Sequence, residues 1–147
     1  MGDGSGPTSY GFATESPYNA DSLKREALAL AKDADVVLYI GGLNKNFNQD
    51  CESGDRLSYG LPFGQVDLIE DLLKVNKKTG IILMSGNGVA MPWLDKIPAL
   101  MQSWYLGSET GSATANVISG EANPSGRLPF SIPKRWEDNG AMSFGTM

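Results

Sequence analysis

Val36-Val37-Leu38-Tyr39-Ile40 is a short run of apolar, largely β-branched residues, and Gly41-Gly42 follows it directly. Such a run, bounded by glycines, is typical of a strand that is buried on both faces of a parallel sheet. Ile81-Ile82-Leu83-Met84 has the same character and is closed by Ser85-Gly86. A shorter third strand is expected within residues 97–102. These runs predict a sheet whose strands are covered on both sides by other elements.

Helical patterns alternate with these strands. Residues 21–33 repeat apolar side chains at helical spacing behind a cap at Asp21 or Ser22. Residues 64–75 present one broad apolar face, and residues 109–119 are rich in small side chains, as in a helix packed closely on a sheet. Residues 128–132, flanked by prolines, are expected to form a last edge strand. The alternation predicts an α/β fold, a three-layer sandwich with a mostly parallel sheet and helices on both faces.

Composition excludes several classes of function. The formal net charge is −5 and no Lys/Arg stripe is present, so nucleic acid is not an expected partner. The apolar runs are far shorter than the roughly 20 residues of a membrane span, so no membrane partner is expected. One cysteine and no histidine rule out an intrachain disulfide, a cysteine metal cage and a Ser-His or Cys-His couple. We expect neither a metal nor a cofactor.

The chain of 147 residues is sized for one domain. Residues 1–19 are rich in Gly, Ser and Pro and are expected to form a flexible lead-in without the pattern of a secretory signal. Residues 20–136 are assigned to the α/β sandwich domain, and residues 137–147 to a C-terminal tail. The compartment of the parent protein does not follow from these residues.

A long polar loop leaves the first predicted strand. It reads Asn-Lys-Asn-Phe-Asn-Gln-Asp-Cys-Glu-Ser-Gly-Asp-Arg-Leu-Ser-Tyr-Gly-Leu-Pro over residues 44–62. Within it, Glu52, Asp55 and Arg56 place two carboxylates and a guanidinium close together. Loops at this edge of an α/β sheet commonly present catalytic or binding groups. The sequence therefore predicts a functional site in this loop.

Three segments together resemble the second, α/β sandwich domain of family 3 glycoside hydrolases, the β-glucosidase and β-xylosidase group. The first is Glu52-Ser-Gly-Asp-Arg56 continuing to Leu61-Pro62 and Gln65. The second is Pro92-Trp93 followed by Trp104-Tyr-Leu-Gly-Ser-Glu-Thr-Gly111, in which Leu106 and Thr110 stand where the family usually shows Pro and Gly. The third is Asn123-Pro-Ser-Gly-Arg-Leu-Pro129 leading to Pro133.

The resemblance implies a fragment of a two-domain retaining β-glycosidase that lacks the first strand of the family's sandwich. It implies that Glu52 is the acid/base, delivered by the loop to a site whose nucleophilic Asp lies in an absent barrel domain of the same parent chain. The substrate would be a β-linked saccharide or glycoside, and the isolated fragment would be inactive. It also suggests a periplasmic or extracellular parent.

Several alternatives stay open at this level. Asp50 is the rival acid. Phe47 and Tyr59 are candidates for lining the aglycone side of the site, while Asp55 and Arg56 are expected to clamp the loop or, as a second choice, to contact sugar. A non-catalytic carbohydrate-binding or interaction module is the alternative function, and an uncovered sheet edge invites a homodimer.

Overall fold

A three-stranded parallel sheet forms the centre of the protein. The computed structural model describes residues 19–45, 49–51 and 54–140. The strands are β1 (Val37–Gly42), β4 (Thr79–Met84) and β5 (Ala99–Gln102), in the order β1-β4-β5. Val37 pairs with Thr79, and Gly80 with Ala99. In this sheet β4 is the central strand, so five of its six residues are buried.

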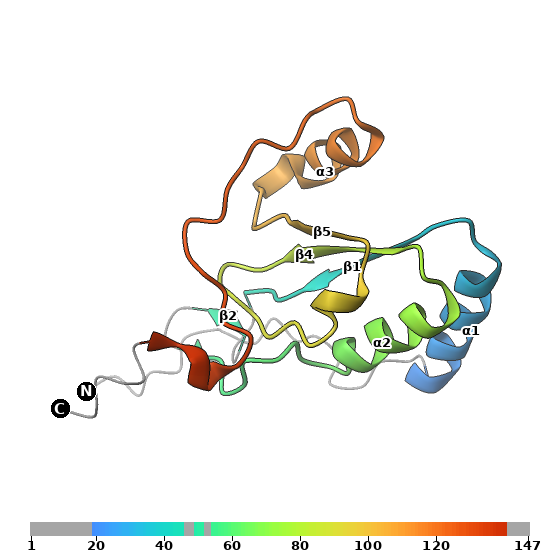
Figure 1. Ribbon diagram of the computed structural model, residues 1–147, viewed down its shortest axis with the longest axis horizontal. Coiled ribbons are helices and arrows are strands. Elements are labelled where there is room, and N and C mark those ends of the chain that lie inside the picture. Colours follow the sequence, from blue (N-terminus) through green and yellow to red (C-terminus); the bar gives the residue numbers. More distant parts are fainter. Residues whose placement is uncertain (1–18, 46–48, 52–53, 141–147) are drawn as a thin grey trace, which may run out of the picture.

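Helices cover both faces of this sheet (Figure 1). The helices α1 (Ala20–Asp33) and α2 (Gln65–Val75) lie on one face, and α3 (Thr110–Ser119) lies on the other. Short 3-10 turns occur at η1 (Leu94–Lys96), η2 (Gly107–Glu109) and η3 (Trp136–Asp138). The predicted α/β sandwich, with a parallel sheet and helices on both faces, is confirmed.

The helix ends follow simple capping rules, although one predicted cap was wrong. Helix α1 is capped by Asn19, whose Oδ1 accepts a hydrogen bond of 3.0 Å from the Ser22 N–H, and not by Asp21 or Ser22. An asparagine before the first turn satisfies one of the free N–H groups there, which leaves both later residues inside the helix. Helix α3 ends at Gly120, whose φ of 83° is the left-handed conformation that glycine adopts without strain.

The hydrophobic core lies between the central strand and α2. Trp93 is completely buried in it, as is Ile69. A large aromatic ring buries more apolar area than any other side chain. Because Trp93 is completely buried, the Pro92-Trp93 turn closes this side of the domain. The fully or nearly fully buried members of the cluster are Leu43, Leu61, Ile69, Leu73, Ile81, Leu83, Val89 and Trp93.

The prediction that the first strand is buried on both faces was wrong. Leu38 and Ile40 are 47% and 55% exposed, while Tyr39 between them packs on the core. Within the described residues β1 is at the edge of the sheet, and α3 covers the opposite face near β5 instead (Figure 1). No described helix covers the side of β1 on which Leu38 and Ile40 lie, although both residues are apolar. Pairing of this edge with a second copy stays a prediction.

The predicted edge strand at residues 128–132 is also not formed. This segment is irregular and runs from α3 past the ends of the strands toward η3 (Figure 1). Pro129 and Pro133 each lack the N–H that a strand would donate. The segment therefore serves as a connection that runs past the ends of the strands.

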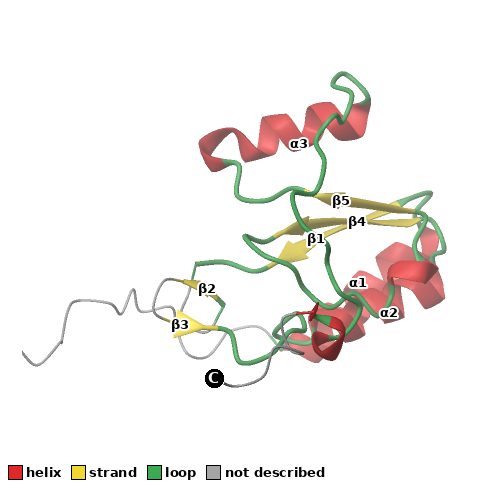
Figure 2. Ribbon diagram, turned by 60° about the vertical axis from the view of Figure 1, so that its left-hand side comes forward, coloured by secondary structure: helices red, strands yellow, loops and turns green. Residues whose placement is uncertain are grey.

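A small hairpin, which the sequence patterns did not predict, lies beyond the sheet. Its strands are β2 (Asp50–Cys51) and β3 (Gly54–Asp55), paired antiparallel with Cys51 opposite Gly54. Figure 2 shows it standing apart from the sheet, on the side where β1 and β4 end. Among the described residues, no helix is long and apolar enough to span a membrane.

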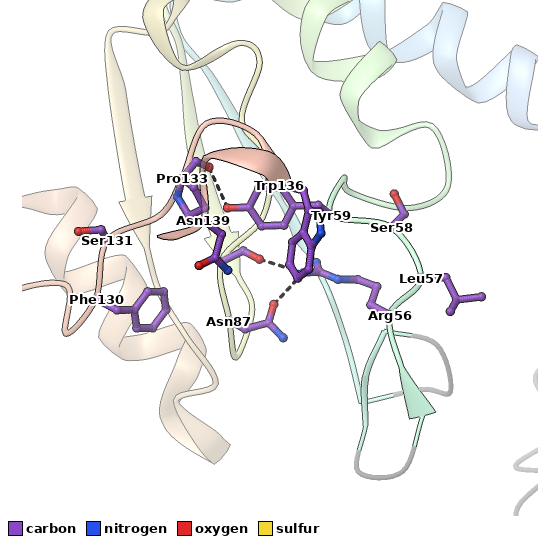
Figure 3. A pocket seen from close by; sticks show the side chains of 11 residues that line it. Arg56, Leu57, Ser58, Tyr59, Asn87, Phe130, Ser131, Pro133, Trp136 and Asn139 are labelled. Carbon is purple, nitrogen blue, oxygen red and sulfur yellow. Dashed lines mark hydrogen bonds between the residues drawn. The ribbon is translucent and has the colours of Figure 1, made fainter. Parts of the chain in front are cut away.

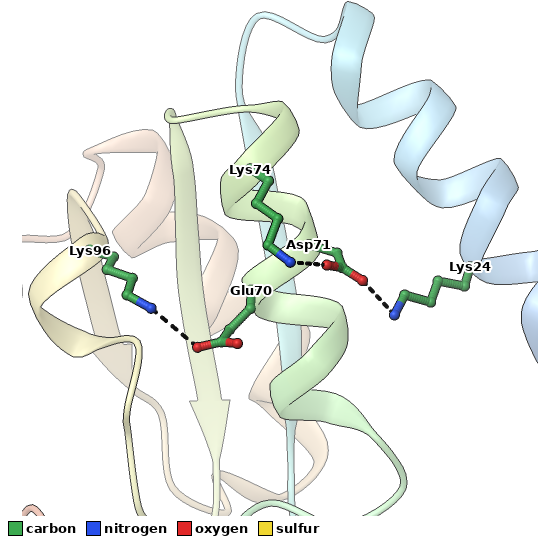
Figure 4. A network of polar contacts seen from close by, with 5 residues as sticks. All are labelled: Lys24, Glu70, Asp71, Lys74 and Lys96. Carbon is green, nitrogen blue, oxygen red and sulfur yellow. Dashed lines mark hydrogen bonds and ion pairs between the residues drawn. The ribbon is translucent and has the colours of Figure 1, made fainter.

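Ion pairs hold α2 to its neighbours (Figure 4). The Asp71 carboxylate lies 2.6 Å from Lys24 Nζ of α1 and 2.7 Å from Lys74 Nζ of its own helix. Glu70 pairs with Lys96 of η1 at 3.2 Å. The hydrogen bonds from Lys24 and then Lys74 lower the pKa of Asp71 to about 2.

Gly42 is a position where we expect any side chain to be destabilising. Its φ is 138°, and a Cβ atom there would overlap the backbone carbonyl of Met84 on the neighbouring strand. We therefore expect Gly42→Ala to lower the free energy of unfolding by about 3 kcal/mol. Gly111→Ala in α3 is the matched control, because a Cβ atom there meets nothing within 4 Å. Urea denaturation measures both, and equal stability of the two variants would contradict the expected overlap.

The Asp71 ion pairs predict a pH dependence of stability. Because the pKa of Asp71 is lowered on folding, its contribution is fully present above the unfolded value of about 3.8. It is lost as the pH falls from there toward about 2. Urea denaturation across this range should show a smaller loss of stability for Asp71→Asn than for the wild type. Asp35→Asn, at an exposed site without an ion pair among the described residues, should behave as the wild type does.

Candidate functional site

The candidate site lies at the carboxyl ends of the parallel strands. The β2–β3 hairpin and the loop 85–91 after β4 meet there, together with Tyr105, which follows β5. Figure 2 shows the hairpin on this side of the sheet. The carboxyl edge is where loops from successive strands converge and where open α/β sheets bind ligands. The loops therefore converge at the carboxyl edge of the sheet, where the sequence predicts a site.

Asp50 is the centre of a hydrogen-bond network that ties the hairpin to the sheet. Its Oδ2 accepts from the Gly86 backbone N–H at 2.5 Å and from the Tyr105 hydroxyl at 2.7 Å. Its Oδ1 accepts from the side-chain amide of Asn87. Burial, and then the Asp50 carboxylate, raise the pKa of Tyr105 well above its usual range, so Tyr105 stays a donor. One carboxylate thus joins segments that follow three different strands.

Arg56 extends the same network on the other side of Asn87. Its Nη2 donates to the Asn87 side-chain oxygen and to the Gly88 carbonyl, both at 2.9 Å. Burial lowers the pKa of Arg56, and the nearby Asp50 carboxylate opposes that shift. Its Nε and Nη1 are buried and have no acceptor among the described residues. Arg56 therefore clamps the loop through one nitrogen and keeps unused donors on the other two.

Two of the predicted site residues, Glu52 and Phe47, lie outside the described residues. The pairing of Cys51 with Gly54 means that residues 52 and 53 connect the two strands of the anchored hairpin. Asp55 belongs to β3, where its backbone pairs with Asp50, and its side chain is outside the described part of the structure.

Gln65 attaches the far end of the long loop to β1. Its Oε1 accepts from the Tyr39 hydroxyl and from the Gly42 N–H, both at 2.8 Å. Its Nε2 donates to the carbonyls of Gly42 at 2.8 Å and Pro62 at 3.1 Å. Burial raises the pKa of Tyr39 to about 12, so this hydroxyl also remains a donor. The loop is thus held at both of its ends.

A cavity of about 760 Å³ opens beside Arg56 (Figure 3). The Tyr59 hydroxyl donates to the Pro133 carbonyl at 2.9 Å, and its ring lies 6.0 Å from that of Trp136 at a tilt of 55°. Burial raises the pKa of Tyr59. The cavity is lined by Arg56, Leu57, Ser58, Tyr59, Asn87, Gly88, Phe130, Ser131, Pro133, Trp136 and Asn139.

The structure brings Arg56 and Tyr59 together at one cavity, and it adds residues that the sequence patterns did not indicate. Asn87 could have been found, because it directly follows a buried strand at the carboxyl edge. Tyr105 stands in the second of the three resembling segments, and Trp136 lies at the predicted end of the domain. Nothing in the local sequence indicates that these last two approach the loop. Among the described residues, no group of three or more acidic, His or Cys side chains is arranged to hold a metal.

The family model and the similar proteins agree with one another. The family model for the glycosyl hydrolase family 3 C-terminal domain matches residues 1–146. The chain is 55% identical to beta-glucosidase BoGH3A of Bacteroides ovatus over 142 residues, which is 96% of this chain and 19% of that protein. It is 40% identical to beta-glucosidase B of Emericella nidulans over 130 residues, covering 87% of this chain and 15% of the relative.

A solved structure has the same fold. The crystal structure of the beta-glucosidase from Kluyveromyces marxianus in complex with glucose superposes with a TM-score of 0.80 at 36% identity, over 86% of this chain and 15% of that one. The chain spans less than a fifth of each of these three relatives. Because the family model covers nearly every residue, this chain belongs to the glycosyl hydrolase family 3 C-terminal domain family.

Proposed function

We propose that this chain is the acid/base-bearing domain of a retaining β-glycosidase with β-glucosidase-like activity. Its relatives named beta-glucosidase are five or more times its length, which leaves room in a parent for the barrel domain that the family resemblance implies. In this proposal Glu52 is the acid/base and the barrel supplies the nucleophile. The substrate is a β-linked saccharide or glycoside.

The anchoring of the hairpin is the observation that carries this proposal. A retaining glycosidase needs two carboxyl groups about 5 Å apart, one to attack the anomeric carbon and one to protonate the leaving oxygen. An acid on a free loop would rarely reach that geometry. Here Cys51 and Gly54, which flank residues 52 and 53 in the sequence, belong to strands, and Asp50 is bonded to the loops after β4 and β5. We take this anchored hairpin as the support from which the acid acts.

Asp50 is less suited to the acid role than Glu52. Both of its oxygens already accept hydrogen bonds, from Gly86, Asn87 and Tyr105. A carboxylate whose two oxygens are both engaged cannot turn to protonate a substrate without losing those bonds. We therefore assign Asp50 to positioning and Glu52 to proton transfer.

The remaining loop residues take supporting roles in this proposal. Tyr59 and Arg56 line the cavity beside the hairpin, so they face the leaving group. Phe47 and Asp55 are proposed to contact substrate from the same loop. The alternative, a carbohydrate-binding or interaction module without catalysis, would need no acid on an anchored hairpin.

Substitution of Glu52 in the full-length parent tests the acid role. Glu52→Gln should lower kcat/KM for saccharides and alkyl glucosides by about 10² to 10⁴, because these leaving groups need a proton. Dinitrophenyl β-glucoside, whose leaving group departs without one, should be affected much less. Steady-state kinetics on both substrates measures the difference.

Asp50→Asn is the matched control for that experiment. It removes the charge that anchors the hairpin, so both substrates should slow by a similar factor. Equal losses on the two substrates in Glu52→Gln would contradict the acid role, and a leaving-group dependence in Asp50→Asn would transfer that role to Asp50. The isolated chain should not hydrolyse aryl β-glucosides, and clear turnover by it would contradict a nucleophile from another domain.

A further inference from the structure

We propose that Leu57 and Phe63 form a docking surface for another domain of the parent chain, with Phe63 as its anchor. Both side chains belong to the segment that runs from the hairpin to α2, and every residue of that segment is described. The inference rests on the proposed function only in that the parent carries a further domain. It does not use the acid/base assignment.

The exposure of these two side chains is the first observation. Leu57 and Phe63 are the most exposed large apolar side chains among the described residues, at 94% and 83%. A single exposed leucine is ordinary on a protein surface. Here, however, both lie in one short loop, on either side of Leu61, which is buried in the core. Large apolar groups that are left in water together mark an interaction surface.

The backbone of Phe63 is the second observation. Its φ is 59°, in the left-handed region that costs a bulky residue free energy and that glycine and asparagine adopt more readily. Among the other described residues, only Trp104 combines a positive φ with a side chain. Glycine at position 63 would remove both the strain and the exposed ring. Phe63 therefore opposes folding in two ways, which points to a contact outside the described fold.

The turn that carries Phe63 is fixed on both sides. Leu61, two residues before it, is buried in the core. After it, Gln65 donates twice to the Pro62 carbonyl, from its backbone N–H at 3.3 Å and from Nε2 at 3.1 Å. An aromatic ring on a backbone held in this way loses little conformational entropy on binding. This property suits an interface anchor.

A further domain of the parent is the partner that fits this surface. The chain spans less than a fifth of each relative compared above, so most of a parent of similar length lies outside it. Figure 3 shows the Leu57 side chain turned away from the side chains that surround the cavity, and Phe63 is not among the residues that line it. The docking surface is apolar, so it fits an apolar patch on the second domain and not a charged one.

Hydroxyl-radical footprinting with mass spectrometry measures the exposure of Phe63 directly. Its oxidation rate should fall by about tenfold from the isolated chain to the full-length parent, because an interface anchor is desolvated. Ile118 of α3, on the opposite face of the sheet, is the control and should be oxidised equally in both. An unchanged rate at Phe63 in the parent would overturn the proposal. Protection that develops in the isolated chain as its concentration rises would make a second copy the occupant and would also overturn it.

Substitution of Phe63 should act differently in the two settings. Phe63→Asn removes the ring and keeps a residue that tolerates left-handed backbone. In the isolated chain the urea midpoint should be unchanged or higher, whereas in the full-length parent the thermal midpoint should fall by a few degrees. Phe63→Met, which stays apolar, is the matched control and should retain most of the parent's value. An equal loss of stability in the isolated chain and in the parent would show a structural role and overturn the docking surface.

The outcomes separate this inference from the proposed function. If the kinetics of Glu52→Gln reject the acid role, protection of Phe63 in the parent would still support the docking surface. If those kinetics support the acid role while Phe63 stays open to oxidation in the parent, the proposed function stands and the docking surface is rejected.

Discussion

The arrangement of the candidate site depends on the Asp50 carboxylate. It accepts hydrogen bonds from Gly86, Asn87 and Tyr105, and these donors follow the central and the last strand of the sheet. The two-residue strands of the hairpin have little pairing energy of their own, since an isolated hairpin is marginally stable at best. The network ties the hairpin to the carboxyl edge of a packed sheet. Arg56, which directly follows β3, adds a second tie to the loop after β4 through Asn87 and Gly88.

Asn87 makes this network continuous with the cavity. Its amide joins Asp50 to Arg56, and Arg56 in turn reaches the backbone at Gly88. A network of this kind is strong when its members are satisfied and costly where they are not. The two unused nitrogens of Arg56, which are buried, are the exception, and Arg56 itself lines the cavity.

Much of the fold could be predicted from residue patterns alone. The apolar runs at 36–40 and 81–84 predicted strands, and periodicity predicted the three helices to within a few residues. The predictions that were wrong concern the burial of one strand and the pairing of another. Leu38 and Ile40 are as apolar as a buried strand requires, yet their strand lies at an edge. Residues 128–132 alternate as a strand would, but their prolines and their course past the sheet leave them unpaired.

For the candidate site, the sequence by itself determined the loop, the local concentration of charge and the presence of Arg56 and Tyr59 within that loop. These features are local, because they depend on residues near one another in the chain. Only the tertiary structure decided that Asp50 accepts a hydrogen bond from Tyr105 and that Trp136 lines the same cavity as Arg56. Contacts across such separations arise from the strand order and the path of the last connection. They depend on how the sheet packs, which no local pattern encodes.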